Sequence, residues 1–113
     1  MGASTDPSRY SNRAVLRLIA AGYSVIPVGL NTGEIGGLKI HPPEEKFDEV
    51  DTVSIYLNPK NQSFLYSILK ELAPRRVIFN PGAENPALEK ALTENKIETM
   101  EACTLVLLST GQF

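Results

Sequence analysis

The sequence predicts an α/β fold with parallel strands, and three observations lead to this prediction. Segments with apolar residues at helical spacing alternate with short segments rich in β-branched residues. The elements follow in the order helix, strand, strand, helix, strand, helix, strand, which suits right-handed crossovers between parallel strands. The chain has 113 residues, 42% apolar and 21% charged, which is the size and composition of one globular domain. We therefore expect a single domain over residues 1–113.

The first helix is expected over residues 14–21. Its apolar residues fall at helical spacing, and Ser11 and Gly22 are the expected N-cap and C-terminal stop. The next segment, residues 23–28, is short and β-branched, and it ends at Gly29. It predicts a buried strand directly after the helix.

The middle of the chain begins with a loop. Residues 31–47 hold three glycines and two prolines, which predicts a loop with one brief strand around residues 34–39. Residues 51–57 resume strand character. Pro59 stands where a first helical turn is expected, and an apolar stripe follows it at Phe64, Leu65, Ile68, Leu69 and Leu72. A second amphipathic helix is therefore predicted.

The last third of the chain predicts two more strands and two more helices. Residues 75–79 form the third expected strand, and residues 86–95 the next helix, with Asn85 as N-cap and Pro86 at its first position. Residues 97–100 and 103–108 are the last expected strand and helix. The apolar tail, residues 103–113, either seals the core or pairs two subunits as a homodimer.

Candidate binding residues lie in the loops, because ligands of open parallel sheets bind at the carboxyl ends of the strands. Gly2, Ala3 and Ser4 precede the first helix, where backbone N–H groups can hold a phosphate, although one glycine also fits an ordinary turn. Arg9 and Ser11 would add charged and hydroxyl contacts.

The segment after residues 23–28 bears on which nucleotide is bound. An NAD site places an Asp or Glu there to bind the ribose hydroxyls. Here Gly29, Leu30 and Asn31 carry no carboxylate, which disfavours NAD and leaves room for a ribose that bears a phosphate.

Other residues with reactive side chains have plain interpretations. The turn at residues 80–85, which contains Gly82, either faces a ligand or is shaped only by its Pro and Gly. We interpret His41 as a surface loop residue and Cys103 as a small buried hydrophobe. No catalytic or metal-binding arrangement stands out, so no reaction is predicted.

Charge and hydropathy exclude two classes of partner. The net charge is −2 and the basic residues are scattered, so no surface for nucleic acid is predicted. The apolar runs are much shorter than the ~20 residues of a membrane span and no leader precedes them, so we expect a cytoplasmic protein. One cysteine cannot form an intrachain disulfide, which suits a reducing compartment.

Four segments in order carry a resemblance to a known family. They are residues 2–28, "GEIGGLKI", "TVSIYLNP" and the stretch from "VIFNPGAEN" to Cys103. Together they resemble the small stand-alone CoA-binding domain proteins, relatives of the nucleotide-binding domain in the succinyl-CoA synthetase alpha subunit. The resemblance implies a Rossmann-like three-layer sandwich with a mostly parallel sheet. It also implies binding of CoA or a similar adenine nucleotide, with no metal and no reaction of its own.

The resemblance also implies ligand-binding positions. The glycine loop of the family, with the Arg and Ser after it, matches Gly2, Ala3, Ser4, Arg9 and Ser11. The adenosine edge matches Leu30 and Asn31, and the family lysine matches Lys39. Two later loops match Asn58, Pro59, and the turn Pro81, Gly82, Ala83, Glu84 and Asn85.

This sequence departs from the family pattern in three places. The usual "V-N-P" is Val28, Gly29 and Leu30, and the usual "D-R-C" ending is Glu101, Ala102 and Cys103. The family's first strand has no counterpart before Gly2. Either the chain is trimmed at its N-terminus, which we expect, or the sheet closes on four strands and leaves the glycine loop unsupported. An NAD(P)-dependent enzyme module and a regulatory interaction protein with a degenerate cleft remain alternative functions.

Overall fold

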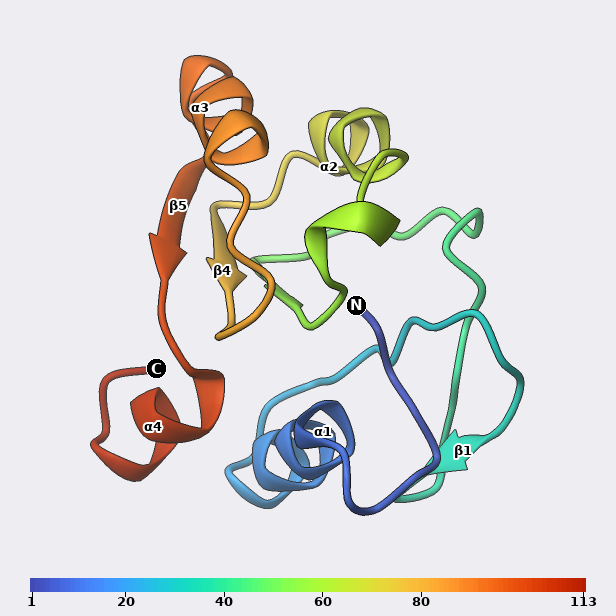
Figure 1. Cartoon of the computed structure of the whole chain (residues 1–113). Coiled ribbons are helices and arrows are strands. Elements are labelled where there is room, and N and C mark those ends of the chain that lie inside the picture. The colour runs from blue at the N-terminus through green and yellow to red at the C-terminus, as the bar shows by residue number, and fades with distance from the viewer. The chain divides into compact units, whose positions relative to one another are not determined.

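The computed structural model describes residues 1–113 (Figure 1). By its internal contacts the chain divides into two compact units. Unit 1 is Met1–Glu45 with Thr104–Phe113, and unit 2 is Lys46–Cys103. The expectation that residues 1–113 form a single domain stays a prediction.

Unit 2 is built on a parallel sheet of three strands in the order β3-β4-β5. Its strands are β3 (Thr52–Ile55), β4 (Arg76–Phe79) and β5 (Glu98–Glu101). All four residues of the central strand β4 are buried, as expected of a parallel strand enclosed on both faces. The predicted α/β class with a mostly parallel, Rossmann-like sheet is confirmed.

The strands of unit 2 are connected through helices. The 3₁₀ helix η1 (Pro59–Asn61) and helix α2 (Leu65–Leu72) follow β3, and α3 (Pro86–Glu94) follows β4. Leu65, Leu69 and Leu92 are fully buried, and α2 and α3 pack against each other. With right-handed crossovers, the strand order β3-β4-β5 places both helices on the same face of the sheet.

Two of the helix starts in unit 2, those of η1 and α3, follow a capping asparagine. The side chain of Asn85 accepts a hydrogen bond from the Leu88 N–H, and Pro86 opens α3, as predicted. Pro59 does open a helical turn, but that turn is the separate η1, capped by Asn58. The α-helix itself begins only at Leu65.

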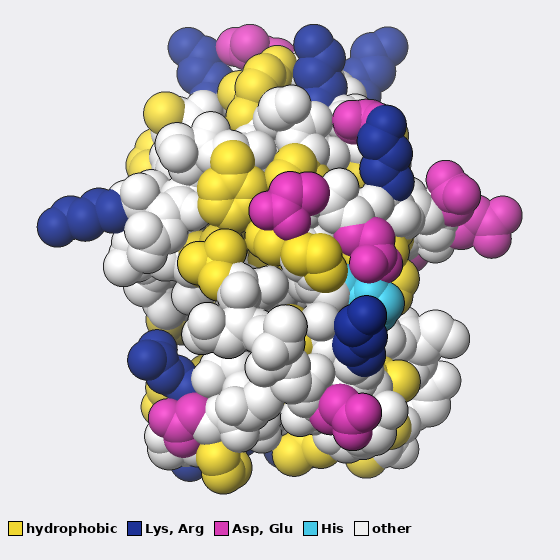
Figure 2. Space-filling model, turned by 90° about the vertical axis from the view of Figure 1, so that its right-hand side faces the viewer, with side chains coloured by type: hydrophobic (Ala, Val, Ile, Leu, Met, Phe, Trp, Pro, Cys, Tyr) yellow, Lys and Arg dark blue, Asp and Glu magenta, His cyan; other side chains and the backbone are white.

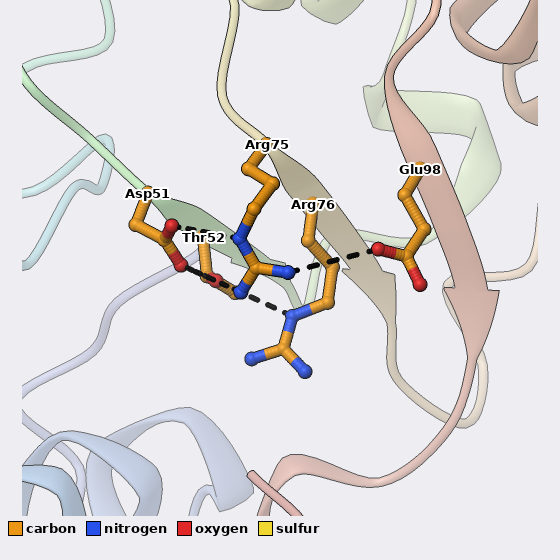
Figure 3. A network of polar contacts seen from close by, with 5 residues as sticks. All are labelled: Asp51, Thr52, Arg75, Arg76 and Glu98. Atoms are coloured by element: carbon orange, nitrogen blue, oxygen red, sulfur yellow. Dashed lines mark hydrogen bonds and ion pairs between the residues drawn. The ribbon is translucent and has the colours of Figure 1, made fainter.

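An ion-pair network joins the first residues of the three strands (Figure 3). Arg75 donates to both carboxylate oxygens of Asp51 at 2.9 and 3.0 Å, and lies 3.7 Å from Glu98. The Nε of Arg76 donates to the Thr52 hydroxyl at 3.3 Å. These side chains hold the register in which Thr52, Arg76 and Glu98 stand side by side.

Unit 1 contains α1 (Tyr10–Ala20), α4 (Thr104–Ser109) and a β-hairpin of β1 (Glu34–Ile35) and β2 (Leu38–Lys39). The one brief strand predicted near residues 34–39 is thus two antiparallel strands. Gly36 and Gly37 form the two-residue turn between them, with φ of 56° and 84°, values that suit a type I′ turn.

The core of unit 1 lies between α1 and the hairpin. Val15, Ile35 and Ile40 form its buried cluster. Helix α4 packs on α1, and the rings of Tyr23 and Phe113 meet edge to face with centroids 5.1 Å apart. The tail therefore packs within its own unit, which agrees with a sealing role, and pairing of subunits stays a prediction.

The two ends of α1 differ in how well they were predicted. Gly22 ends the helix as expected. It has φ +90°, and it and Tyr23 donate back to Ile19 and Leu18 in a Schellman arrangement. The prediction of Ser11 as N-cap is wrong. The helix begins at Tyr10, its cap position is Arg9, and Ser11 is a buried residue of the first turn.

The strand predicted at residues 23–28 is also wrong. Only Val28 forms a bridge, parallel to His41, and Tyr23 and Ile26 are about half exposed. Pro27 has no N–H to donate to a neighbouring strand. The segment therefore makes isolated backbone hydrogen bonds and no continuous strand pairing. The Val28 carbonyl accepts two of these bonds, from Gly2 and Ala3.

Candidate functional site

The predicted site residues fall in both units, and each set is described within its own unit. Unit 1 holds the first set: Gly2, Ala3, Ser4, Arg9, Ser11, Leu30, Asn31 and Lys39. Unit 2 holds the second set: Asn58, Pro59, Pro81 and Gly82.

The glycine loop of unit 1 is attached to the segment that contains Val28. The N–H groups of Gly2 and Ala3 donate to the Val28 carbonyl at 2.9 and 2.8 Å, so these donors are engaged within the protein. Gly2 has φ +90°, a conformation that favours glycine. These two N–H groups are therefore not available to a ligand in this conformation.

Gly29 allows the glycine loop to approach closely. A Cβ at Gly29 would lie 2.5 Å from the carbonyl oxygen of Ala3. A Cβ at Gly33 would likewise lie 2.4 Å from the Thr5 side chain. At Gly29 the chain therefore approaches the backbone of residue 3 at a distance that only glycine permits, and at Gly33 it lies close to the Thr5 side chain. This gives Gly29, a departure from the family pattern, a structural reason.

The residues between the glycine loop and α1 are ordered by side-chain hydrogen bonds. Asn12 is buried and donates from Nδ2 to the Ser4 carbonyl at 2.8 Å. The Ser4 hydroxyl accepts from the Asp6 N–H. Hydrogen bonds from Ser8, with a smaller contribution from Arg9, hold the pKa of Asp6 below its usual value. Sequence reasoning missed Asn12, although a polar residue on the apolar side of a predicted helix is a usable signal.

Arg9 and Lys39 are the exposed cations of the unit 1 set. Arg9 precedes the first turn of α1, where the helix dipole also favours an anion. Lys39 lies on β2, opposite Glu34 in the hairpin. Leu30 is 75% exposed and Asn31 is also exposed, so the adenosine edge expected there offers an apolar surface and an amide. Ser11, in contrast, is only 6% exposed.

In unit 2 the predicted residues follow the carboxyl ends of β3 and β4. Asn58 and Pro59 are exposed, and the Asn58 side chain accepts from the Lys60 N–H at 3.0 Å. Pro81 and Gly82 are exposed in the next loop. Gly82 has φ +91° and its N–H donates to the Glu84 carboxylate at 2.8 Å.

Gln62 is a further residue of this edge, and sequence reasoning missed it. It is only 2% exposed and lies between η1 and α2. Its Nε2 donates to the carbonyls of Leu57 and Ala83, each at 2.8 Å, and its Oε1 accepts from Asn85. The available signal is a polar side chain directly before an apolar helical stripe, which also fits an ordinary surface residue.

Acidic side chains collect at the start of α3. Burial, a hydrogen bond with Glu101 and repulsion from Glu101 and Glu84 together raise the pKa of Glu89. Glu89 also accepts from the Asn85 N–H at 3.2 Å. Negative charge therefore lies beside the Pro81 and Gly82 loop, whereas Asn58 and Pro59 are followed by the exposed cation Lys60. Figure 2 shows a face on which the basic side chains are dispersed among acidic and hydrophobic ones.

His41 and Cys103 are placed differently from what the sequence suggested. The His41 side chain is 29% exposed and its Nδ1 lies 2.6 Å from Glu45, so it is a half-buried, paired residue. Cys103 is a free thiol and is only partly buried. No group of three potential metal ligands occurs in the structure. None of the helices combines the length and the hydropathy that a membrane span requires.

Comparisons with known proteins give one family and several solved structures. The model of a family described as a CoA binding domain matches residues 1–109. No curated protein matches the chain.

Among solved structures, one uncharacterized protein has a TM-score of 0.96 and 46% identity, covering 99% of this chain and 93% of its own. A protein from Thermus thermophilus has a TM-score of 0.86 and 28% identity, and the match covers 100% of this chain and 87% of the Thermus chain. A conserved hypothetical protein from Pyrococcus furiosus has a TM-score of 0.74 and 29% identity, and the match covers 89% of this chain and 87% of the Pyrococcus chain. These structures share a fold with the chain over most of its length.

Proposed function

This chain belongs to the CoA-binding domain family, and on that basis we propose that it binds CoA or a closely related adenine nucleotide without catalysing a reaction. The observation that carries the proposal is the extent of the family match. It spans residues 1–109 and so includes every predicted binding residue.

The charges of the unit 1 set support a ligand with several phosphates. Arg9 and Lys39 are exposed, and Arg9 lies at a helix N-terminus. Charge-assisted hydrogen bonds to phosphate are stronger than neutral ones. CoA carries a diphosphate and a 3′-phosphate on its ribose, so cations near the ligand favour it over an unphosphorylated nucleoside.

The residues at Leu30 and Asn31 support CoA over NAD. A carboxylate that binds both ribose hydroxyls would repel a ribose phosphate. Neither residue is acidic, and the exposed Leu30 offers an apolar surface to an adenine ring. NADP, whose ribose also bears a phosphate, is the competing ligand that the experiment has to separate.

The test is a thermal-shift screen with CoA, acetyl-CoA, dephospho-CoA, ADP, NAD and NADP. A ligand present at ~100 times its dissociation constant stabilises the native state by ~2.7 kcal/mol, which raises the melting temperature measurably. We expect a rise with CoA and acetyl-CoA and a smaller rise with dephospho-CoA. A rise with NADP but not CoA would favour the dehydrogenase-type alternative, and no rise with any ligand would favour an interaction protein.

Two controls sharpen the result. Lys39→Gln is expected to weaken CoA binding, whereas Lys90→Gln, an exposed charge change on α3, is expected to leave it unchanged. Incubation with acetyl-CoA and a thiol reagent tests the absence of a reaction. Steady release of free thiol above the buffer rate would contradict the non-catalytic role.

A further inference from the structure

We propose that Gln62 is a positioning residue that joins the two ligand loops of unit 2 and holds them at a fixed distance from each other. The first loop, residues 57–62, follows β3, and the second, residues 80–85, follows β4. The inference adds a residue and a role to the proposed function. The inference is tested by a CoA-binding measurement, which rests on the proposed function, and by amide hydrogen exchange in the ligand-free protein, which does not.

The side chain of Gln62 joins the two loops directly. Its Nε2 donates one hydrogen to Leu57 in the first loop and the other to Ala83, 21 residues further along the chain. Its Oε1 accepts from the side chain of Asn85 at 3.0 Å. Both amide hydrogens and the carbonyl of Gln62 are thus used, and the two donated bonds reach different loops.

The orientation of both amides follows from their partners. The carbonyl oxygens of Leu57 and Ala83 only accept hydrogen bonds, so the nitrogen of Gln62 has to face them. Asn85 accepts from the Leu88 N–H through Oδ1, so its nitrogen faces Gln62. A flip of either amide would set like groups against each other. The network therefore has one arrangement.

No other hydrogen bond joins residues 57–62 to residues 81–85. Some neighbouring bonds stay within one loop, as from Ala83 N–H to the Asn80 carbonyl and from Lys60 N–H to the Asn58 side chain. Others attach Asn80 to Ser54 and Ile55 of β3. Because Gln62 is 2% exposed, water does not compete freely for its partners. Asn80, at the start of the second loop, is already attached to the end of β3, since its N–H and Nδ2 both donate to the Ile55 carbonyl. Gln62 is the side chain that joins the two loops beyond that point.

The experiment compares wild type with Gln62→Leu and Gln62→Glu by amide hydrogen exchange in the ligand-free protein. Gln62→Leu keeps the bulk of the side chain and removes both donors, so the amides of Asn61 and Ala83 are expected to exchange at least about tenfold faster relative to those of β4. In Gln62→Glu a carboxylate faces two carbonyls at neutral pH. On acidification the protonated acid regains one of the two donors, so loop protection is expected to recover in part as the pH falls from about 8 to about 5.

A control separates coupling from simple loss of stability. Leu69→Ala removes a fully buried side chain of α2 and leaves the amide network in place. It is expected to lower global stability without selective exchange of the two loops and without recovery at low pH. Loop exchange in Gln62→Leu and Gln62→Glu that stays parallel to β4, as in this control, would overturn the coupling.

The binding measurement uses CoA as the probe. Under conditions where all variants are folded, we expect CoA affinity to fall about tenfold or more in Gln62→Leu and to stay near wild type in Leu69→Ala. Wild-type affinity in Gln62→Leu would overturn the positioning role. Absence of CoA binding by wild type would refute the proposed function alone, because the exchange measurements still decide the coupling.

Discussion

Replacing Gly29 by alanine tests the close approach on which the glycine loop depends. The new Cβ would lie 2.5 Å from the carbonyl oxygen of Ala3 and 3.2 Å from the Ile40 side chain. The first neighbour is backbone, which cannot turn away as a side chain can. Residues 2–4 therefore have to move, and the hydrogen bonds from Gly2 and Ala3 to Val28 have to stretch or break.

The expected cost combines three contributions. Overpacking of a tight site costs about 1–3 kcal/mol. Each weakened hydrogen bond adds about 0.5–1.5 kcal/mol if the loop detaches instead of shifting. The lower entropy of the unfolded chain returns about 0.4–1 kcal/mol when alanine replaces glycine. With both hydrogen bonds weakened, we expect Gly29→Ala to lower the free energy of unfolding by about 1–5 kcal/mol.

Urea denaturation measures that loss, and amide exchange at Ala3 locates it. Gly37→Ala is the matched control, because a Cβ there meets nothing within 4 Å and the substitution only strains a left-handed φ of 84°. That strain costs about 1–2 kcal/mol. Both variants lose stability, but only Gly29→Ala should expose the Ala3 amide. A Gly29→Ala protein as stable as wild type, with Ala3 exchange unchanged, would refute the reasoning.

Two further predictions concern pH. Hydrogen bonds from Arg75 and Thr52 lower the pKa of Asp51 from 3.8 to about 2, so its contribution to stability is present above pH 4 and is lost as the pH falls toward 2. The urea midpoint of Asp51→Asn should accordingly lie below that of wild type at pH 7 and converge with it near pH 2, whereas a constant gap would contradict the pairing. Burial and Glu101 raise the pKa of Glu89, so ionisation destabilises the native state above its ordinary pKa of 4.5. Glu89→Gln keeps an acceptor for the Asn85 N–H and should melt at a higher temperature than wild type at pH 8 but not at pH 4; equal melting at both values would contradict the repulsion.

Elements with strong local signals were predicted well from the sequence. Asn85 and Pro86 marked the start of α3, and Gly22 marked the end of α1, because each residue acts on the backbone beside it. The apolar stripe through Leu65 and Leu69 likewise marked the buried side of α2. Parallel order followed from the alternation of helices and strands.

The wrong predictions concern segments whose conformation depends on contacts with residues distant in the sequence. Residues 23–28 have the composition of a strand, but pairing in this segment depends on partners elsewhere in the chain, and only Val28 has one. Ser11 fits an N-cap by type, yet the cap position is Arg9, two residues earlier, and Ser11 is buried in the first turn of the helix. Local propensity is a weak prior when tertiary contacts compete with it.

The sequence predicted which loops form the candidate site but not the hydrogen bonds that join those loops. The sequence singled out Asn58, Pro59, Pro81 and Gly82 because they follow predicted strands. It contained no signal that Gln62 reaches a carbonyl 21 residues away. Nor did it reveal that Gly29 is pressed against the Ala3 carbonyl, since close approach of two backbones is visible only in three dimensions.

The split composition of unit 1 bears on how the protein folds during its synthesis. Its first part, Met1–Glu45, leaves the ribosome before any of unit 2, but α4, which packs on α1, lies in Thr104–Phe113. The side of α1 that meets α4 thus stays uncovered while the next 58 residues, Lys46–Cys103, are made. Unit 2 is continuous in sequence and can complete its sheet first, because domains formed from one stretch of chain close shorter loops. Helix α1 is therefore made before unit 2 but gains its contact with α4 only after unit 2 has been made.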